Sequence, residues 1–274
     1  MFAVPGDIEP LTGGRGGSVR AGDLVLSPGR GPRVQDLLSP VLARLAVDLD
    51  TRPGRDHRDL RIAMPVPARD GSWVVDGWAA SRFEPGTRQL TDLAATRAVG
   101  AVLHAELARV VTSWPPALEP PVGRWAVAGR VAFGEDPLPD DGLDPEVQGL
   151  LAHLAAARDD TDLGPAQLVH GDLAGNILLD PQGAPVVIDL APYWRPALWA
   201  EATAVLDGVV RGHADPLAMD AWVTGPRRQA MLRAAIFRIV SDHPADLRAY
   251  EAALGPLLAR IRPRGLSACG RSAG

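Results

Sequence analysis

Apolar residues recur at helical spacing in several stretches of this 274-residue chain, and glycine, proline or charged residues separate one stretch from the next. This spacing predicts helices over residues 34–48, 91–110, 145–158, 197–210 and 227–240. The helix from 91 to 110 has Thr91 in a position to cap its first turn.

Short apolar runs bounded by turn residues are typical of strands. In the first part of the chain they predict strands at 24–26, 60–67 and 72–76. The stretch from 112 to 145 has weak periodicity, and we expect loops there with one short helix at 125–133. Because long loops often carry binding residues, this stretch is a candidate substrate-binding insertion.

The predicted strands come first and most of the helices follow them, which indicates an α+β fold of two lobes. We expect residues 1–78 to form a small antiparallel-sheet lobe with one helix, and residues 79–262 to form a larger, mostly helical lobe. The last residues, 263–274, are rich in glycine, serine and arginine, and we expect them to be disordered.

The composition excludes several classes of protein. A formal net charge of −5 with scattered arginines gives no basic surface for nucleic acid. No stretch reaches the roughly 18 to 20 apolar residues of a membrane span, and the first residues lack the positive charge of a secretory signal. Cys269 is the only cysteine, so no disulfide framework is available. We therefore expect a cytoplasmic monomer or homodimer that binds neither membranes nor nucleic acid.

One segment of the second lobe carries the candidate chemistry. Two short apolar runs, 177–179 and 186–188, are joined by a turn sequence and predict a β-hairpin. Because a hairpin returns the chain to where it began, Asp189 comes back to the neighbourhood of Asp172 and Asn176. The sequence therefore gathers two carboxylates and one amide at one end of a hairpin.

Carboxylate and amide oxygens are the ligands that Mg²⁺ takes in phosphoryl-transfer sites. Such a transfer needs positioning and charge neutralisation more than covalent chemistry. We assign Asp172 as the base that accepts the proton of an acceptor hydroxyl, and Asn176 and Asp189 as magnesium ligands. For Asp172 or Asn176 taken alone, the alternative is a turn rich in Asp and Asn that only satisfies its own backbone.

These residues resemble the motif of a known family, the aminoglycoside phosphotransferase and choline kinase superfamily, whose members are distant relatives of protein kinases. The matching residues are His170-Gly171-Asp172-Leu173, then Asn176, then Ile188-Asp189. The resemblance implies a protein-kinase-like fold, ATP or GTP as phosphate donor, Mg²⁺ as cofactor, and a catalytic hairpin at 168–190. Beside the base Asp172, it implies an orienting role for His170.

The resemblance also implies a nucleotide site in the first lobe. The glycine-rich turn at 13–18 would cover the phosphates, because backbone N–H groups without a neighbouring Cβ can approach them closely. The segment 72–82 would be the interlobe hinge that carries adenine. The candidate nucleotide-binding residues are Gly14, Gly16, Gly17, Ser18, Ser27 and Arg30.

The loop from Asp172 to Asn176 departs from the family pattern, since it is one residue shorter than usual. A second departure lies at the end of the strand at 24–26, where the family has a lysine that holds the α- and β-phosphates and this chain has Ser27. The chain contains no lysine, so all 28 residues of its lysine and arginine total are arginines.

A third departure is the absence, from the helix after this strand, of the glutamate that pairs with the lysine; the helix offers only Asp36 on its first turns. Losing both partners together leaves no unpaired buried charge. Arginine binds phosphate well as a planar fork, so we hypothesise that Arg20, Arg30 or Arg33 reaches the phosphates instead.

These features predict a nucleotide- and magnesium-dependent phosphotransferase that acts on a hydroxyl of a small molecule, either an aminoglycoside or another metabolite. The missing lysine leaves two alternatives open: a pseudokinase-type binding protein with weak or no transfer, and a variant that transfers the nucleotidyl group. His104 lies on the apolar face of its helix, and we expect a core histidine without a catalytic role.

Overall fold

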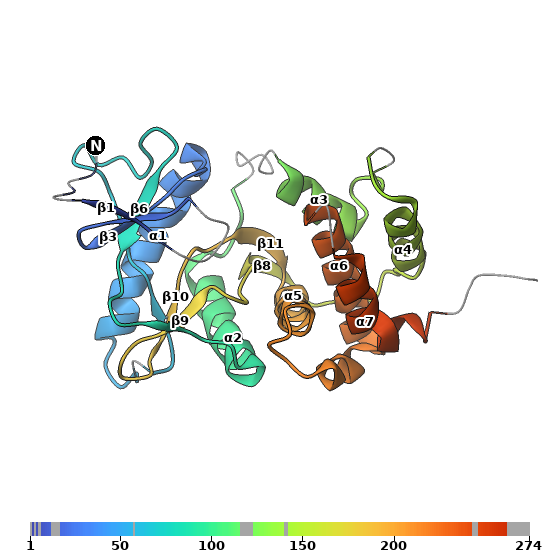
Figure 1. Cartoon of the computed structure of the whole chain (residues 1–274). Helices are drawn as coiled ribbons and strands as arrows, with labels where there is room; N and C mark the ends of the chain where they lie inside the picture. The colour runs from blue at the N-terminus through green and yellow to red at the C-terminus, as the bar shows by residue number, and fades with distance from the viewer. Residues whose placement is uncertain are drawn as a thin grey trace, which may run out of the picture.

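The computed structural model describes residues 2, 4, 7–11, 17–56, 58–115, 123–139, 142–242 and 246–261. The N-terminal part is built on an antiparallel sheet and the C-terminal part is mainly helical, as Figure 1 shows. The α+β class expected from the sequence is therefore confirmed.

The N-terminal sheet has five strands in the order β1-β2-β3-β6-β5, all of them antiparallel to their neighbours. The strands are β1 (Ile8–Pro10), β2 (Val19–Ala21), β3 (Leu24–Ser27), β5 (Pro65–Val66) and β6 (Ala79–Arg82). Ser27 at the end of β3 lies opposite Ala79 at the start of β6. The sheet thus extends through Arg82, past the lobe boundary expected at residue 78.

A second sheet, in the order β4-β10-β9-β7, joins the two parts of the chain. It comprises β4 (Arg61–Ile62), β7 (Arg88–Gln89), β9 (Ile177–Leu179) and β10 (Pro185–Val187). β9 and β10 form the predicted hairpin, with Ile177 opposite Val187. Because β4 pairs with β10 and β7 pairs with β9, both edges of the hairpin are held by strands from the first ninety residues.

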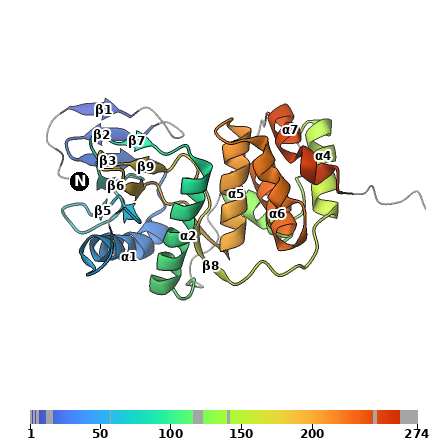
Figure 2. The same cartoon turned by 90° about the horizontal axis from the view of Figure 1, so that it is seen from below.

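The remaining elements surround a core of large side chains. The helices are α2 (Leu93–Val110), α3 (Arg124–Phe133), α4 (Pro145–Ala156), α5 (Ala197–Val210), α6 (Gly225–Ser241) and α7 (Leu247–Leu258), with a 3-10 helix, η1, at Pro216–Trp222. Strands β8 (Ala166–His170) and β11 (Pro192–Pro196) pair antiparallel. Figure 2 shows α5 and α6 side by side. Trp199, Trp222 and Phe237 are buried in one cluster with these helices. None of the helices in the described ranges is long and apolar enough to span a bilayer.

Helix α1 (Pro32–Thr51) links the N-terminal sheet to the rest of the molecule. Proline in its first turn suits a position where the N–H has no helical partner. Its buried stripe, Leu38, Leu42, Leu45 and Leu49, recurs every three or four residues and packs in one cluster with α2, β4 and the β9–β10 hairpin. The helix therefore belongs to the core of both parts.

Two strand predictions need correction. The run at 60–67 is not one strand but two, because β4 joins the second sheet and β5 joins the first. The strand predicted at 72–76 is wrong: Val75 and Trp78 exchange both backbone hydrogen bonds around Asp76-Gly77. Both central residues have positive φ, 51° and 79°, as a two-residue hairpin turn requires. The Asp-Gly pair was the signal for this turn.

The hinge predicted at 72–82 and the helix cap predicted at Thr91 lie at other positions in the structure. Residues 79–82 are a strand, so the connection between the two sheets is the next segment, 83–87. Helix α2 is capped by Asp92, whose Oδ1 accepts the N–H of Ala95 at 2.7 Å, and not by Thr91. The helices predicted in the second half each agree with a helix of the structure.

Candidate active site

The loop between β8 and β9 and the residues after β10 form the candidate site. The N–H of Ile188 donates to the carbonyl of Asn176 at 3.0 Å, and the N–H of Gly171 donates to the carbonyl of Ala191 at 2.9 Å. These two backbone bonds tie the loop to the segment that carries Asp189. The hairpin thus brings the backbones of the predicted metal ligands side by side.

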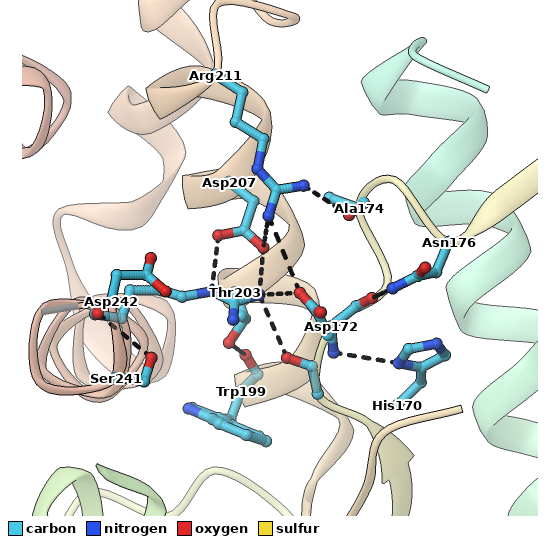
Figure 3. Close-up of polar contacts among 12 residues, drawn as sticks. His170, Asp172, Ala174, Asn176, Trp199, Thr203, Asp207, Arg211, Ser241 and Asp242 are labelled. Atoms are coloured by element: carbon cyan, nitrogen blue, oxygen red, sulfur yellow. Dashed lines mark hydrogen bonds and ion pairs between the residues drawn. The ribbon is translucent and has the colours of Figure 1, made fainter. Parts of the chain in front are cut away.

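Asn176 is oriented by the loop itself. Its Nδ2 donates to the carbonyl of Asp172 at 2.6 Å, which bridges the first and last residues of the short loop (Figure 3). Because Nδ2 is used in this way, Oδ1 faces away from that carbonyl and remains an oxygen donor for a cation. The shorter loop is therefore closed by one of the two candidate metal ligands.

His170 is fully buried and connects Asp172 with the residue before Asp189. Its Nδ1 accepts the backbone N–H of Asp172 at 3.1 Å, and its Nε2 lies 3.3 Å from the carbonyl of Ile188. This arrangement requires a neutral ring with its proton on Nε2. Burial lowers the pKa of His170, in spite of the opposing charges of Asp172 and Asp189. The ring therefore orients the loop and is not placed as an acid or base.

His104 on α2 supports His170 from behind. Its Nε2 accepts the backbone N–H of His170 at 3.2 Å, and its ring is buried. Burial, with a smaller contribution from His170, lowers the pKa of His104 to about 3. The expected core histidine is thus a core residue that also fixes the end of β8.

A buried arginine holds Asp172, and sequence reasoning missed it. Arg238 of α6 donates from Nη2 to Oδ1 of Asp172 at 2.7 Å and from Nε to Oδ1 of Asp207 at 2.7 Å, and it makes a second contact with Asp207 through Nη2. Burial alone would lower the pKa of Arg238, but the two carboxylates raise it. Arg238 therefore stays charged and holds the carboxylates of Asp172 and Asp207 together.

Asp207 on α5 is the other buried member of this group. Burial raises the pKa of its carboxyl group, and the charge of Arg238 opposes that shift. A signal for both residues was present, because each lies within an apolar helical run, AVLDGVV and AAIFRIV. A charge in such a run needs a buried partner of opposite sign.

Asp189 has an unusual backbone and an arginine partner. Its φ of 49° lies in the left-handed region, which costs free energy for a residue with a Cβ. Outside turns such as that of Asp76, residues in this conformation cluster at functional sites. Its Oδ1 accepts a hydrogen bond from Nη2 of Arg30, which lies just beyond β3. Of the three arginines proposed to replace the missing lysine, Arg30 is the one whose contact with the site is seen.

Arg20, another of these three, points elsewhere. Its Nε donates to the carbonyl of Gly22, and its guanidinium lies 4.2 Å from the centre of the Phe83 ring. The predicted phosphate-covering turn is described only at its end, where Ser18 Oγ lies 3.3 Å from Ser27 Oγ and Gly17 has a φ of 90°. Gly14 and Gly16 lie outside the described residues.

A cleft lies between the N-terminal sheet, α1 and the end of β10. Its empty space amounts to about 740 Å³ when the part open to solvent is included. Its polar lining consists of Ser27, Arg30, Gln35, Ser39, Ser81 and Asp189, and most of the rest is apolar. On α1, Gln35 lines the cleft and its Oε1 accepts a hydrogen bond from Ser39 Oγ at 2.8 Å, whereas the exposed Asp36 is not part of the lining.

The described ranges contain no group of three His, Cys, Asp or Glu side chains arranged to hold a metal ion. The predicted magnesium set is of a different kind, because one of its members, Asn176, is an amide. Two oxygen ligands, with the remaining positions left to water and phosphate, are typical of magnesium sites in phosphoryl transfer. The donors present therefore fit Mg²⁺ better than they fit a transition metal.

No protein-family model matches the sequence, and no curated protein matches it either. Among solved structures, the chain is similar to a choline/ethanolamine kinase family protein from Mesorhizobium loti, at 18% identity and a TM-score of 0.47, over 95% of this chain and 94% of that one. It is also similar to an aminoglycoside phosphotransferase from Alicyclobacillus acidocaldarius, at 17% identity and a TM-score of 0.48, over 96% and 91%.

A third similar structure is a macrolide 2′-phosphotransferase from Brachybacterium faecium, at 17% identity and a TM-score of 0.45, over 96% of this chain and 95% of that one. The function of this chain has to be argued from the residues of the site.

Proposed function

We propose that this protein is a nucleotide- and magnesium-dependent phosphotransferase that acts on a hydroxyl group of a small molecule. The observation that carries the proposal is the closure of one loop: Asn176 bonds both the carbonyl of Asp172 and, through its backbone, the N–H of Ile188 next to Asp189. Two carboxylates and an amide are thereby joined in one hydrogen-bonded unit beside a cleft.

Asn176 Oδ1 and the Asp189 carboxylate would hold Mg²⁺. When bound there, the ion would neutralise charge on the phosphate oxygens of the nucleotide. Arg30 is within reach of the same phosphates, because it already contacts Asp189 and lines the cleft. We assign to Arg30 the role that a lysine would have in the family that the motif resembles.

Asp172 would act as the base. Its carboxylate takes the proton of the acceptor hydroxyl as the hydroxyl oxygen forms a bond to the terminal phosphorus. The bond from that phosphorus to the bridging oxygen breaks, and a nucleoside diphosphate leaves with the electron pair. Arg238 holds Asp172 in place from the buried side, and the proton later passes to solvent.

One observation favours a second candidate, a protein that binds nucleotide without transferring phosphate. The ion pair between Arg30 and Asp189 occupies one of the two metal ligands, and the paired lysine and glutamate are both missing. A binding protein would tolerate this pair. An enzyme would have to separate or share it when the metal arrives.

The test combines binding with product analysis. Thermal unfolding is followed with Mg²⁺ and ATP or GTP, because a ligand that binds only the folded state stabilises it by about 2.7 kcal/mol at one hundred times its Kd. We expect stabilisation of the natural protein and of Asp36→Asn, an exposed control, but a weaker effect in Asp189→Asn. Absence of any shift in the natural protein would refute nucleotide binding.

Mass spectrometry then separates the reactions. Choline, ethanolamine, an aminoglycoside and a macrolide are incubated with protein and nucleotide, and a phosphotransferase adds the mass of one phosphoryl group to one of them. Asp172→Asn should abolish that product while leaving nucleotide binding intact. A nucleotidyl adduct would indicate the other transfer, and stabilisation without any product would favour the binding protein.

A further inference from the structure

Arg211 is an exposed cation at the candidate base that no motif singles out. It follows the last residue of α5, and its side chain is 44% exposed. Figure 3 shows its guanidinium above the loop, where Nη1 donates to the carbonyl of Ala174 at 2.8 Å. The side chain thus reaches from α5 across to the middle of the loop between Asp172 and Asn176.

The guanidinium of Arg211 lies close to the candidate base Asp172 but makes no direct hydrogen bond to its carboxylate. Its Nη2 is 4.0 Å from Oδ1 of Asp172 and 3.9 Å from Oδ2 of Asp207, too far for hydrogen bonds in both cases. A guanidinium has five N–H donors, and within the described part of the chain Arg211 uses one of them in a hydrogen bond. The others can serve a ligand.

Arg238, by contrast, is not available to a ligand. It is almost completely buried, and it donates to Asp207 and Asp172 from the protein interior. The two arginines therefore have different roles at this site. Arg238 fixes the carboxylates, and Arg211 presents positive charge on the solvent side of the same carboxylate.

A glycine in the loop permits this contact. Gly175 has a φ of 91°, and a Cβ there would lie 3.1 Å from Nη1 of Arg211 and 3.2 Å from Nε2 of Gln89. A glycine thus lets the guanidinium approach the loop backbone closely.

We propose that Arg211 binds the transferring phosphoryl group from the acceptor side, opposite Arg30. This rests on the proposed function, and the bonds made and broken are those given there. Charge in such a transfer spreads over three phosphoryl oxygens, and a cation supplied in cis can stabilise it. The acceptor oxygen lies against Asp172 when it loses its proton, so the phosphorus it attacks is within reach of Arg211.

A purely structural role would lead to a different result. If Arg211 only fastened the loop through Ala174, its loss would weaken every ligand of the site and lower stability together. If Arg211 binds the transferring group, its loss would weaken binding of ADP together with a mimic of that group. Binding of the nucleoside diphosphate alone would be unchanged. The two roles differ in which complex is weakened.

The experiment measures the affinity of the full-length protein for Mg²⁺ and ADP, with and without aluminium fluoride, which takes the place of the transferring group. We compare Arg211→Ala and Arg211→Gln with the natural protein. Arg97→Ala is the matched control, because Arg97 is 38% exposed and contacts α5 through Glu201. Removal of one transition-state donor typically costs about 10²- to 10³-fold.

We expect both Arg211 variants to bind Mg²⁺ and ADP as tightly as the natural protein does. With aluminium fluoride present, their affinity should be about 10²-fold lower than that of the natural protein. Arg97→Ala should match the natural protein in both measurements. Variants of Arg211 that retain the gain would overturn the proposal, and so would an equal loss for both complexes, which indicates a structural role. If the natural protein binds neither complex, the proposed function itself fails.

Discussion

Arg30 and Asp189 are 159 positions apart and form an ion pair at the proposed nucleotide site. While it contacts Asp189, the arginine competes with a cation for that carboxylate. Once nucleotide is bound, it can turn to the phosphates, which accept its planar fork of donors well. We therefore expect Arg30 to lower the affinity for the metal ion and to raise the affinity for the nucleotide.

Arg30→Ala should lower nucleotide affinity by about 10- to 100-fold, the cost of one or two charge-assisted hydrogen bonds. It should also raise the affinity for Mg²⁺ alone, because Asp189 is released. Titration calorimetry measures both, and Arg44→Ala, at an exposed arginine on α1, is the control. Unchanged nucleotide affinity would show that Arg30 does not replace the lysine.

At the level of single residues, the sequence predicts the local part of the site and not the part that tertiary folding assembles. The hairpin could be foreseen because one turn sequence joins its strands, and the loop with Asn176 lies beside it. Arg238 and Asp207 contact each other across 31 positions and meet only when α5 packs on α6. Their spacing gives no hint of a pair, although the burial of each could have been foreseen.

Between elements, helix α2 and strand β8 are joined by two neutral histidines. His104 accepts from His170, and His170 accepts from Asp172, so protonation of either ring would break a hydrogen bond of the loop. Both pKa values are lower in the folded protein than in the unfolded chain. The unfolded chain therefore binds more protons below pH about 6.5, and stability must fall as the pH falls.

Acidification from pH 7.5 to 5 should remove roughly 2 kcal/mol of stability through His104 alone, since the slope is about 1.4 kcal/mol per pH unit below the unfolded pKa. The stability is fully present above pH about 6.5 and is lost toward the folded pKa of about 3. Urea unfolding at several pH values measures it. His104→Gln should flatten the dependence, whereas His213→Gln, at an exposed site, should leave the contribution of His104 in place. An unchanged slope in His104→Gln would contradict the assignment.

Elements were predicted with uneven success, and the reason is physical. Long amphipathic helices show their period over several turns, which is why α1, α2 and α4 to α6 follow the apolar spacing. Strands of two or three residues have no period to show, and their sheet is chosen by long-range pairing. β4 and β5 are three residues apart in sequence yet belong to different sheets, which no local pattern specifies.

Across the whole molecule, the apolar stripe of α1 is covered by elements from both halves of the chain. Leu45 is 1% exposed and lies in a cluster with Leu103 of α2 and Val187 of β10. Among the residues that the structure describes, the cluster that belongs to the N-terminal sheet alone has four buried members, Phe2, Leu24, Ala68 and Ala80. Because so small a cluster buries little apolar surface, we expect the folding of the N-terminal part to depend on the C-terminal part.

Arginine pairs reinforce this connection. Arg52 at the end of α1 donates to both carboxylate oxygens of Glu106 on α2, at 2.7 and 3.0 Å. Arg61 on β4 contacts Glu84 in the connection between the sheets and Asp180 in the hairpin turn. These ion pairs are partly exposed, so each contributes little to the free energy of unfolding. Their main effect is to fix how the elements they join are positioned. Apolar burial by α1 remains the larger contribution.

Leu45→Ala should therefore destabilise the molecule as a single unit, by about 2 to 5 kcal/mol for a fully buried leucine. Urea unfolding followed by far-ultraviolet circular dichroism reports mainly on the helices of the C-terminal part, and tryptophan fluorescence reports on both parts. The two curves should coincide in the natural protein and shift together in the variant. Val47→Ala, at a position 52% exposed on the same helix, should change stability by less than about 0.5 kcal/mol. Two separate transitions, with only one shifted by Leu45→Ala, would mean that the sheet folds without the helical part and that α1 does not unite them.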